Sequence, residues 1–318
     1  MLNTLFFIVL AALTGIYSQE VHAGACCGGG LSSASLITGD EQARVSLAFS
    51  ARAALADASE TGALAFRGND GLHEDQNLLL VDGSRLLSDR LQVGAHFEAA
   101  SQAIHFTGEP QEPSTGVGDF RVNAGYEFLP EYTYSEWKPR GFAWVGLVLP
   151  TGKSIHETFE PSEALGEGFF TPTLGILFVK RWERWDAAAS AEGRLSIGRK
   201  FEQELSPDFT SLSILGTQLG LGGIATVGYS PGAGDFRLGA RIEPLWRSGR
   251  TVDVDGFESQ TAERSMVSFG ADLTWMFGPQ SSLTASYTDQ TFFGARGLAQ
   301  NSVLSRTVGV ALSHRWDR

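Results

Sequence analysis

Hydrophobic and polar residues alternate one by one along most of the chain after residue 41. In "RVSLAFSAR", Val45, Leu47 and Phe49 fall on one face and the polar residues on the other. The stretches "DRLQVGAHFEA", "DFRVNAGYEF" and "DFRLGARIEP" repeat this pattern. A period of two residues places successive side chains on opposite faces, as in a β-strand and unlike a helix. The sequence therefore predicts an all-β fold.

About twelve segments of this kind follow one another, and they are longer than the strands of most soluble proteins. A soluble strand has about 5–6 residues, whereas a tilted membrane-crossing strand needs about 9–11. The segments lie near 42–53, 75–86, 89–101, 116–129, 140–151, 168–181, 185–199, 212–229, 235–247, 264–277, 282–292 and 304–316.

The connections between these segments alternate between long and short. The long ones cover about 54–74, 102–115, 152–167, 200–211, 248–263 and 293–303. The short ones are "LSD", "PEYTYSEWK", "RWER", "SPGAGD" and "GPQS". Long external loops and short periplasmic turns are typical of bacterial outer-membrane barrels. Residues 42–318 are thus predicted to form a transmembrane antiparallel β-barrel of about twelve strands, with up-and-down topology.

Aromatic residues gather beside the short turns and near the end of the chain. In a membrane barrel they would form a girdle at the periplasmic interface, whereas in a soluble β-sandwich they would belong to the core. The predicted girdle comprises Trp182, Trp185, Trp275, Phe277 and Trp316.

The first residues, "MLNTLFFIVLAALTGIYS", form an apolar run followed by small residues. This pattern predicts a secretory signal peptide over residues 1–23, cleaved after Ala23 or after Ala25, with a retained signal anchor as the alternative. Residues 24–41 then form a short periplasmic segment. Together with the barrel, this places the protein in the outer membrane of a Gram-negative bacterium.

The net charge of −12 argues against a general nucleic-acid partner. The expected partners are outer-membrane lipids, lipopolysaccharide, an unidentified small solute and a possible periplasmic or outer-membrane protein. Acidic residues of the long loops could bridge lipopolysaccharide through divalent cations or could simply form a solvated surface; they are Asp57, Glu60, Asp70, Glu74, Asp75, Glu157, Glu160 and Glu163.

Two short motifs resemble an outer-membrane β-barrel family named for the meta-pathway of phenol degradation. A T-G-x-G-D strand start is matched by residues 115–119, and a strand ending in L-P-T-G by residues 149–152. The resemblance is best over about 85–290 and implies a porin-like or transport role.

The glycines of the first motif permit a tight entry into the strand, and Asp119 can accept hydrogen bonds from backbone amides there. "GAGDFRLGARIEP" at 232–244 repeats this pattern at the opposite end of the predicted barrel. Either the two copies share their turn chemistry, or the strand count is off by one between them.

Charged residues on the polar face are expected to line the barrel interior, because Arg or Lys facing lipid at midplane costs about 2–4 kcal/mol. They could pair across a closed lumen, line a constriction that selects small polar or anionic solutes, or only stabilise the interior. The candidate selectivity residues are Arg44, Arg52, Arg90, Glu98, Arg121, Glu127, Glu192, Arg194, Arg237, Arg241, Glu243 and Asp272, and His96, Asn123 and Asp186 share the same face.

The function indicated is passage of small solutes across the outer membrane; a closed barrel that serves as a scaffold or docks a partner is the alternative. An outer-membrane enzyme is a third reading, with His314 and a serine such as Ser286 or Ser313 as candidates. The chain has no G-x-S-x-G or H-E-x-x-H motif. No catalytic residue, metal or cofactor is therefore predicted.

The two cysteines of the chain, Cys26 and Cys27, are adjacent and precede three glycines. Two such residues cannot build a tetrahedral metal site by themselves. A disulfide, acylation of Cys26, and an inert flexible leader remain open.

Overall fold

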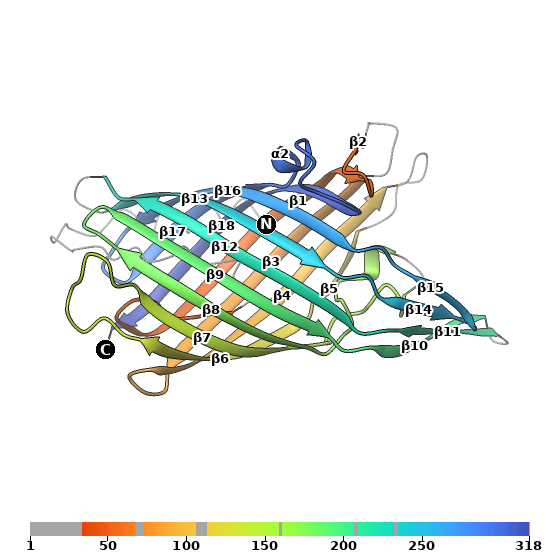
Figure 1. The fold of residues 1–318 in the computed structure, drawn as a ribbon, viewed down its shortest axis with the longest axis horizontal. Coiled ribbons are helices and arrows are strands. Elements are labelled where there is room, and N and C mark those ends of the chain that lie inside the picture. Colours follow the sequence, from red (N-terminus) through yellow and green to blue (C-terminus); the bar gives the residue numbers. More distant parts are fainter. Residues whose placement is uncertain are drawn as a thin grey trace, which may run out of the picture.

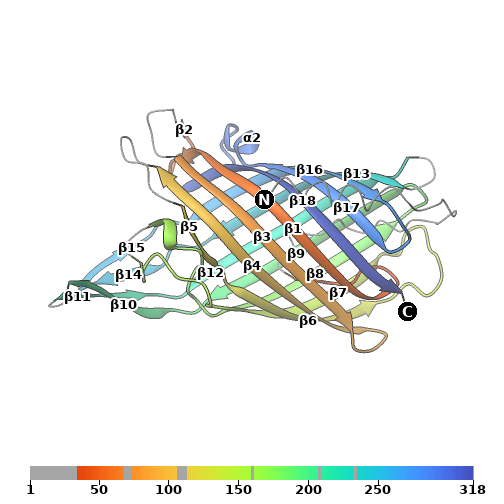
Figure 2. The same cartoon turned by 180° about the vertical axis from the view of Figure 1, so that it is seen from behind.

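Twelve long antiparallel strands hydrogen-bond in a closed ring (Figures 1 and 2). The computed structural model describes residues 34–317, apart from 68–72, 106–112, 159–160, 207–208 and 232–234. Among these residues the main sheet has fourteen strands, and two of them, β2 (Leu64–Phe66) and β5 (Ser114–Val117), are short additions outside the ring. The ring strands are β1 (Glu41–Ala58), β3 (His73–Leu86), β4 (Leu91–His105), β6 (Phe120–Leu129), β7 (Arg140–Leu149), β8 (Thr171–Arg181), β9 (Trp185–Ser196), β12 (Gln218–Tyr229), β13 (Phe236–Arg247), β16 (Arg264–Met276), β17 (Ser281–Asp289) and β18 (Ser302–Asp317).

The ring closes between the first and the last strand. Residue Val45 of β1 lies opposite His314 of β18, and Phe49 lies opposite Val310. Every other ring strand pairs with the ring strands that precede and follow it in the sequence. This confirms the predicted fold class, a closed antiparallel barrel of twelve strands with up-and-down topology. The strand count was correct, so Asp119 and Asp235, the last residues of the two G-x-G-D copies, lie at opposite ends of the barrel; residues 232–234 of the second copy lie outside the described residues.

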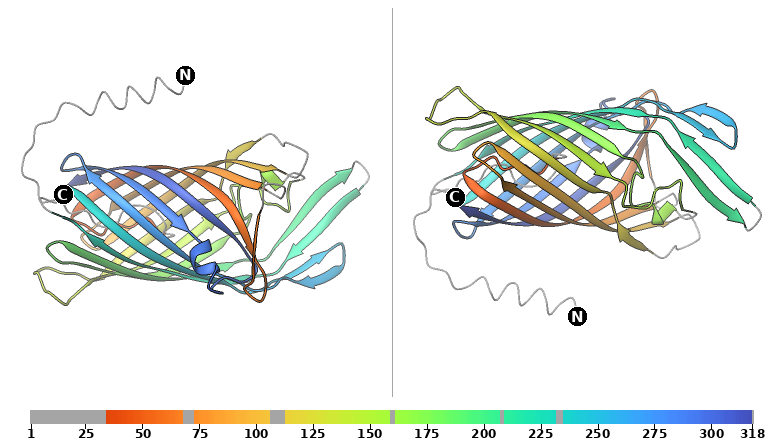
Figure 3. Two further views of the ribbon diagram at one scale, coloured as in Figure 1. Left: turned by 90° about the horizontal axis from the view of Figure 1, so that it is seen from above. Right: turned by 90° about the horizontal axis from the view of Figure 1, so that it is seen from below.

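The long connections leave one end of the barrel and contain ordered elements of their own (Figure 3). They hold β2 (Leu64–Phe66), β5 (Ser114–Val117), the 3₁₀ turn η1 (Pro161–Glu163) and the short helix α2 (Thr291–Gly294). Four further strands form a separate sheet that extends beyond the ring: β10 (Arg199–Ser206), β11 (Phe209–Leu215), β14 (Thr251–Val254) and β15 (Phe257–Gln260). No helix in the described part of the chain is long and apolar enough to cross a membrane.

This second sheet corrects two predicted boundaries. Residues 200–211, expected as a loop, contain most of a β-hairpin, and the strand expected over 212–229 is divided in two. The break falls at Gly216, whose amide donates a 2.8 Å hydrogen bond to the Thr251 carbonyl of the neighbouring long connection. Pairing of β11 with β14 therefore pulls the first half of the predicted strand away from the barrel wall.

The outer surface of the ring is apolar and its inner surface is polar. On β1, Val45, Leu47 and Phe49 are 43–54 % exposed, whereas Ser46 and Ser50 are buried inside. The same alternation runs along β18, where Val308, Val310 and Leu312 face outward. An apolar band of this kind, exposed on a closed barrel, is suited to lipid acyl chains.

Aromatic rings form a belt at the end of the barrel that carries the short turns and the C-terminus. Trp185 lies 4.7 Å from Tyr229 between ring centroids, and Trp275 lies 5.6 Å from Phe277. Trp316 is 45 % exposed on the same rim, and Trp182 donates a hydrogen bond to the Glu136 carbonyl. The predicted girdle residues therefore share one rim, and their place at a membrane interface stays a prediction.

Candidate functional site: the barrel lumen

The most buried charge in the lumen is the guanidinium of Arg237, which is 2 % exposed. It donates two hydrogen bonds of 2.7 and 2.8 Å to Asp186 and one of 2.6 Å to Asp272. Gly228 and Gly239 make room for this cluster, because a Cβ on either would lie within 2.4 Å of its polar atoms. β9, β13 and β16 are thus linked on their inner face by one charged triad.

Other predicted lumen residues also pair along the inner wall. Arg241 forms a 2.7 Å ion pair with Glu243, and Arg194 forms one of 2.5 Å with Glu192. His96 contacts Asp82 at 2.8 Å and Glu98 at 3.9 Å. Arg52 donates to the Ser305 hydroxyl at 2.9 Å, and Arg44 donates to the Leu36 carbonyl at 2.6 Å.

Arg90 differs from this set. It lies in the turn between β3 and β4, and its guanidinium contacts the hydroxyl and the ring of Tyr132, which is 77 % exposed. Its alternation with Gln92 suggested a lumen position, but the strand begins only at Leu91, so Arg90 belongs to the rim.

The segment before the first strand lies inside the barrel, against β4, β6 and β7. The sequence pattern placed residues 24–41 in the periplasm, whereas residues 34–40 run along the inner wall. Gln92 receives a hydrogen bond from the Ile37 amide at 2.5 Å and donates to the Ile37 carbonyl at 3.2 Å. Asn123 exchanges an equivalent pair with Ser35, both at 3.1 Å. Residues 24–33, with Cys26 and Cys27, lie outside the described residues, as does the predicted signal peptide.

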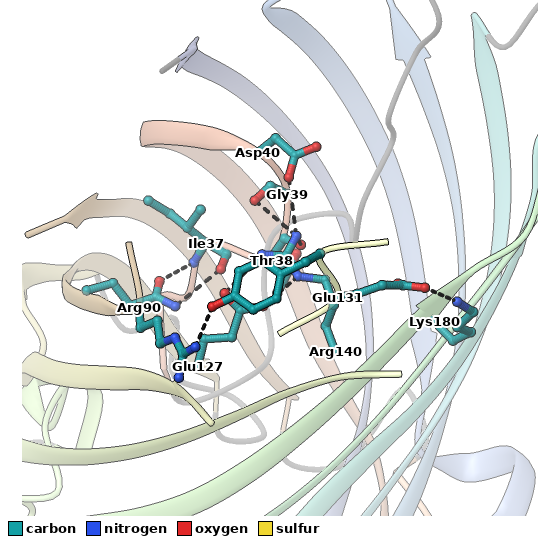
Figure 4. A network of polar contacts seen from close by, with 11 residues as sticks. Ile37, Thr38, Gly39, Asp40, Arg90, Glu127, Glu131, Arg140 and Lys180 are labelled. Atoms are coloured by element: carbon teal, nitrogen blue, oxygen red, sulfur yellow. Dashed lines mark hydrogen bonds and ion pairs between the residues drawn. The ribbon is translucent and has the colours of Figure 1, made fainter. Parts of the chain in front are cut away.

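The backbone of this segment is further held by Arg140 at the start of β7 (Figure 4). Arg140 donates to the Thr38 carbonyl at 3.0 Å and to the Gly39 carbonyl at 3.3 Å, while two hydrogen bonds join it to Glu127. The predicted lumen residue Glu127 therefore serves to orient the arginine that binds the segment.

Apolar packing adds to these hydrogen bonds. Ala34 and Leu36 lie in a buried cluster with Phe142, Trp144 and Val179 inside the barrel. Glycines on the facing wall allow the close approach: a Cβ on Gly94 would lie 2.3 Å from the Ser35 carbonyl oxygen, and one on Gly125 would lie 2.5 Å from Leu36. The wall is therefore shaped to receive the segment, which narrows the lumen towards the short-turn end.

The T-G-x-G-D and L-P-T-G motifs meet at the other end of the lumen. Thr151 accepts a hydrogen bond from the Phe120 amide and donates one to the Gly118 carbonyl, both at 2.9 Å. Asp119 accepts from the amides of Gly152 at 3.1 Å and Glu167 at 2.8 Å. Burial raises the pKa of the Asp119 carboxyl, although these amide hydrogen bonds act in the opposite direction. Asp119 thus fastens both ends of the connection between β7 and β8.

This fastened connection places Glu167 among arginines from three strands. Partial desolvation in this half-exposed position would raise the pKa of the Glu167 carboxyl, but Arg247, Arg194 and Arg121 together hold that pKa below its usual value. Arg247 contacts it at 2.7 Å. A pocket opens here; it is lined by Asp119, Arg121, Val148, Glu167, Thr171, Arg194, Ser196, Gln218, Gly220 and Arg247.

Guanidinium groups outnumber carboxylates in and around this pocket. Arg121, Arg194 and Arg247 line it, and Arg250 lies beside it with its guanidinium 4.4 Å above the ring of Phe169. Among the described residues, the buried Nε of Arg121 and Nη1 of Arg250 have no hydrogen-bond partner. Buried guanidinium nitrogens that lack a partner are suited to a negatively charged or carbonyl-bearing solute.

The enzyme candidates are separated by the barrel wall. His314 Nδ1 lies 2.9 Å from the Ser281 hydroxyl on the girdle rim, and its ring packs against Trp316. Ser313 instead contacts Ser46, and Ser286 donates to the Gly309 carbonyl. Within the described ranges, no three His, Cys, Asp or Glu side chains gather as metal ligands would.

The whole barrel is similar to solved structures of other proteins. The COG4313 outer membrane channel from Pseudomonas putida F1 superposes with a TM-score of 0.64 at 15 % sequence identity, over 91 % of this chain and 100 % of that one. The chain has the fold of an outer-membrane β-barrel. The beta domain of the Bordetella autotransporter Brka (TM-score 0.45, 12 % identity, 87 % and 100 % coverage) and the NanC porin (0.41, 9 %, 85 % and 98 %) are more distant.

No known protein-family profile matches the sequence, and no curated protein matches it either. The resemblance to the phenol meta-pathway family therefore stays a prediction.

Several residues of the lumen site were missed from the sequence. Arg140, Arg247 and Arg250 lie at strand ends, where an alternating pattern no longer distinguishes inside from outside. Glu167 lies in a connection, and its only signal was the stretch "GEGFF" that contains it, in which Gly166 permits the close approach to Asp119. The N-terminal segment carried a weak signal: the apolar residues Ala34, Leu36 and Ile37 of "ASLIT", shortly before β1.

Proposed function

We propose that this barrel carries small solutes across the outer membrane and that it favours anions. The observation that carries the proposal is the arginine pocket at the long-connection end of the lumen, where guanidiniums outnumber carboxylates and two buried donors are free. Rings of arginine or lysine select anions in other pores by the same electrostatics. The fold likeness to an outer-membrane channel agrees with this role.

The route runs between the two elements that narrow the lumen. The fastened β7–β8 connection narrows it at one end and residues 34–40 narrow it at the other. Paired charges such as Arg237 with Asp186 and Asp272 line the inner wall. A passage narrowed in this way suits small solutes rather than oligomers.

Reversal potentials in planar bilayers test the proposal. The purified full-length protein should conduct, and in a potassium chloride gradient its reversal potential should have the sign of an anion-selective pore. Arg121→Gln should shift that potential towards zero, because it removes a pocket charge without breaking an ion pair of the wall. Arg85→Gln is the matched control, since Arg85 is exposed at the opposite rim. A cation-selective pore, or an equal shift in both variants, would overturn the anion preference.

A closed barrel is the second candidate, and the same narrowing supports it. Residues 34–40 are buried against the wall and the β7–β8 connection is tied at both ends. If the protein inserts into bilayers but never conducts at any voltage, the scaffold function stands and solute passage is excluded.

A further inference from the structure

The short helix α2 lies on the outer surface of the barrel, beside the rim with the long connections (Figures 1 and 3). It covers Leu304 of β18, which alternates with the outward-facing Val308 and Val310 yet is fully buried. Gly294 allows this contact, because a Cβ there would lie 2.4 Å from Leu304 Cδ1. The ring of Phe292 lies 5.8 Å from that of Phe269 on β16. The helix is therefore packed onto the lipid-facing wall.

The height of this helix on the barrel follows from the strand geometry. Arg306 of β18 contacts Thr291 of α2, and it lies ten residues (316 − 306) from the girdle residue Trp316. Ten residues at about 3.3 Å each, tilted by about 40°, rise about 25 Å, which is the height of the apolar band of a membrane barrel. Between these two positions Val308, Val310 and Leu312 are exposed. Arg306 is thus the first charged outward residue beyond the apolar band.

Two guanidiniums lie beside α2. Arg306 is 50 % exposed; it donates to Asp289 at 2.8 Å and to the Thr291 hydroxyl at 3.3 Å. Arg296 is exposed, stacks 4.1 Å over the Phe292 ring and donates to the Phe292 carbonyl at 2.8 Å. Both arginines are held in place and keep donors that point to solvent or lipid.

Asp289 holds these side chains in place, and its own carboxylate is buried. It is 7 % exposed and also accepts hydrogen bonds from the amides of Thr291 and Phe292 and from the hydroxyls of Thr291 and Tyr287. One buried carboxylate beside two guanidiniums leaves a net positive patch. Phe292 and Leu298, 47 % and 49 % exposed, add apolar surface next to it.

We propose that this α2 patch, made of Phe292, Arg296, Leu298 and Arg306, binds the phosphorylated head group of a glycolipid of the outer leaflet. Arginine pairs with phosphate through two parallel hydrogen bonds, and the apolar side chains contact the first part of the acyl chains. The outer leaflet of a Gram-negative outer membrane consists of lipopolysaccharide, whose lipid A carries phosphates, and Arg306, one apolar band away from the girdle, would lie at head-group height. The proposal depends on the long connections facing outward and is independent of conduction through the lumen.

Native mass spectrometry of the full-length barrel with defined lipids tests the site. Bis-phosphorylated lipid A should be retained, and retention should fall about tenfold in Arg296→Gln, the loss expected for one charge-assisted contact. This variant breaks no ion pair and should fold. The double variant Arg296→Gln/Arg306→Gln should retain still less lipid A. Replacing Arg306 by lysine instead, in Arg296→Gln/Arg306→Lys, should recover part of the retention that the double glutamine variant loses.

Three comparisons decide the outcome. Arg85→Gln, which removes an exposed cation at the opposite rim, should bind like the unmodified protein. Dephosphorylated lipid A should bind weakly to all variants. Equal retention of phosphorylated and dephosphorylated lipid A, equal retention of phosphatidylglycerol, or retention unchanged in the double variant would each overturn the proposal.

Discussion

At the residue scale, the charged triad of Arg237, Asp186 and Asp272 shows how this barrel tolerates buried charge. Three charges removed from water are stable only while each has its partner. The guanidinium spans two neighbouring carboxylates with hydrogen bonds of 2.6–2.8 Å. The triad is therefore sensitive to the loss of one member and tolerant of the loss of all three.

Arg237→Gln should lower the free energy of unfolding by about 3–5 kcal/mol, because two carboxylates are left without a counter-charge. Urea unfolding in lipid vesicles, followed by tryptophan fluorescence, measures this change. The triple variant Asp186→Asn/Arg237→Gln/Asp272→Asn should regain most of the loss. A triple variant as unstable as the single one would show that the charges themselves, not their balance, stabilise the wall.

At the scale of elements, glycines on the inner wall decide whether residues 34–40 can lie in the lumen. Gly94→Val should displace the segment, since its Cβ would lie 2.3 Å from the Ser35 carbonyl oxygen. We expect a higher conductance together with faster thiol labelling of a Ser35→Cys reporter.

Gly83→Val is the matched control for this substitution. Gly83 lies on the adjacent strand β3, and nothing lies within 4 Å of a Cβ built there. Conductance and labelling should match those of the parent protein. If both valine variants behave alike, the segment does not narrow the lumen in the membrane.

The connection between β7 and β8 depends on one carboxylate in the same way. Asp119→Ala removes the acceptor for the amides of Gly152 and Glu167, and each lost contact to a charged group costs about 1.5–3 kcal/mol. The connection should detach, and limited proteolysis should cleave it faster while the barrel strands stay protected. Asp119→Asn, which keeps one carbonyl acceptor, should be cleaved at an intermediate rate; cleavage as slow as in the parent protein would contradict this role.

At the scale of the whole molecule, the charge of Glu167 sets how positive the lumen is. Its pKa lies below its ordinary value near 4.5, so its pairing with Arg247 is fully present above that pH and is lost as the pH falls through the lowered pKa. The anion-to-cation permeability ratio should therefore be constant from pH 7 to about 4.5 and should rise below it.

Glu167→Gln separates this effect from other titrations. The variant should show the raised ratio already at pH 7 and should change little on acidification. Reversal potentials across the pH range measure both proteins. A ratio that rises equally in both would assign the titration to another group.

Most of the barrel was predictable because an alternation of apolar and polar residues with a period of two indicates a β-strand and no other element. The alternation on β1, β4 and β13 identified strands and faces, and the girdle tryptophans identified the short-turn rim. Prediction failed where backbone pairing overrides side-chain pattern, as at Gly216, where β11 leaves the wall to join β14. It also failed for Arg90, because alternation does not show where a strand begins.

The sequence by itself determined which side chains face lipid, since alternating polarity on a closed sheet leaves no other arrangement. It also determined which charges must avoid the membrane. Only the tertiary structure decided which of those charges meet, because partners such as Arg140 and Thr38, or Asp119 and Glu167, are brought together by closure of the ring and by chain segments that enter it. Contacts across a barrel depend on which strands lie opposite and on what occupies the lumen, and neither is written in the local pattern of the chain.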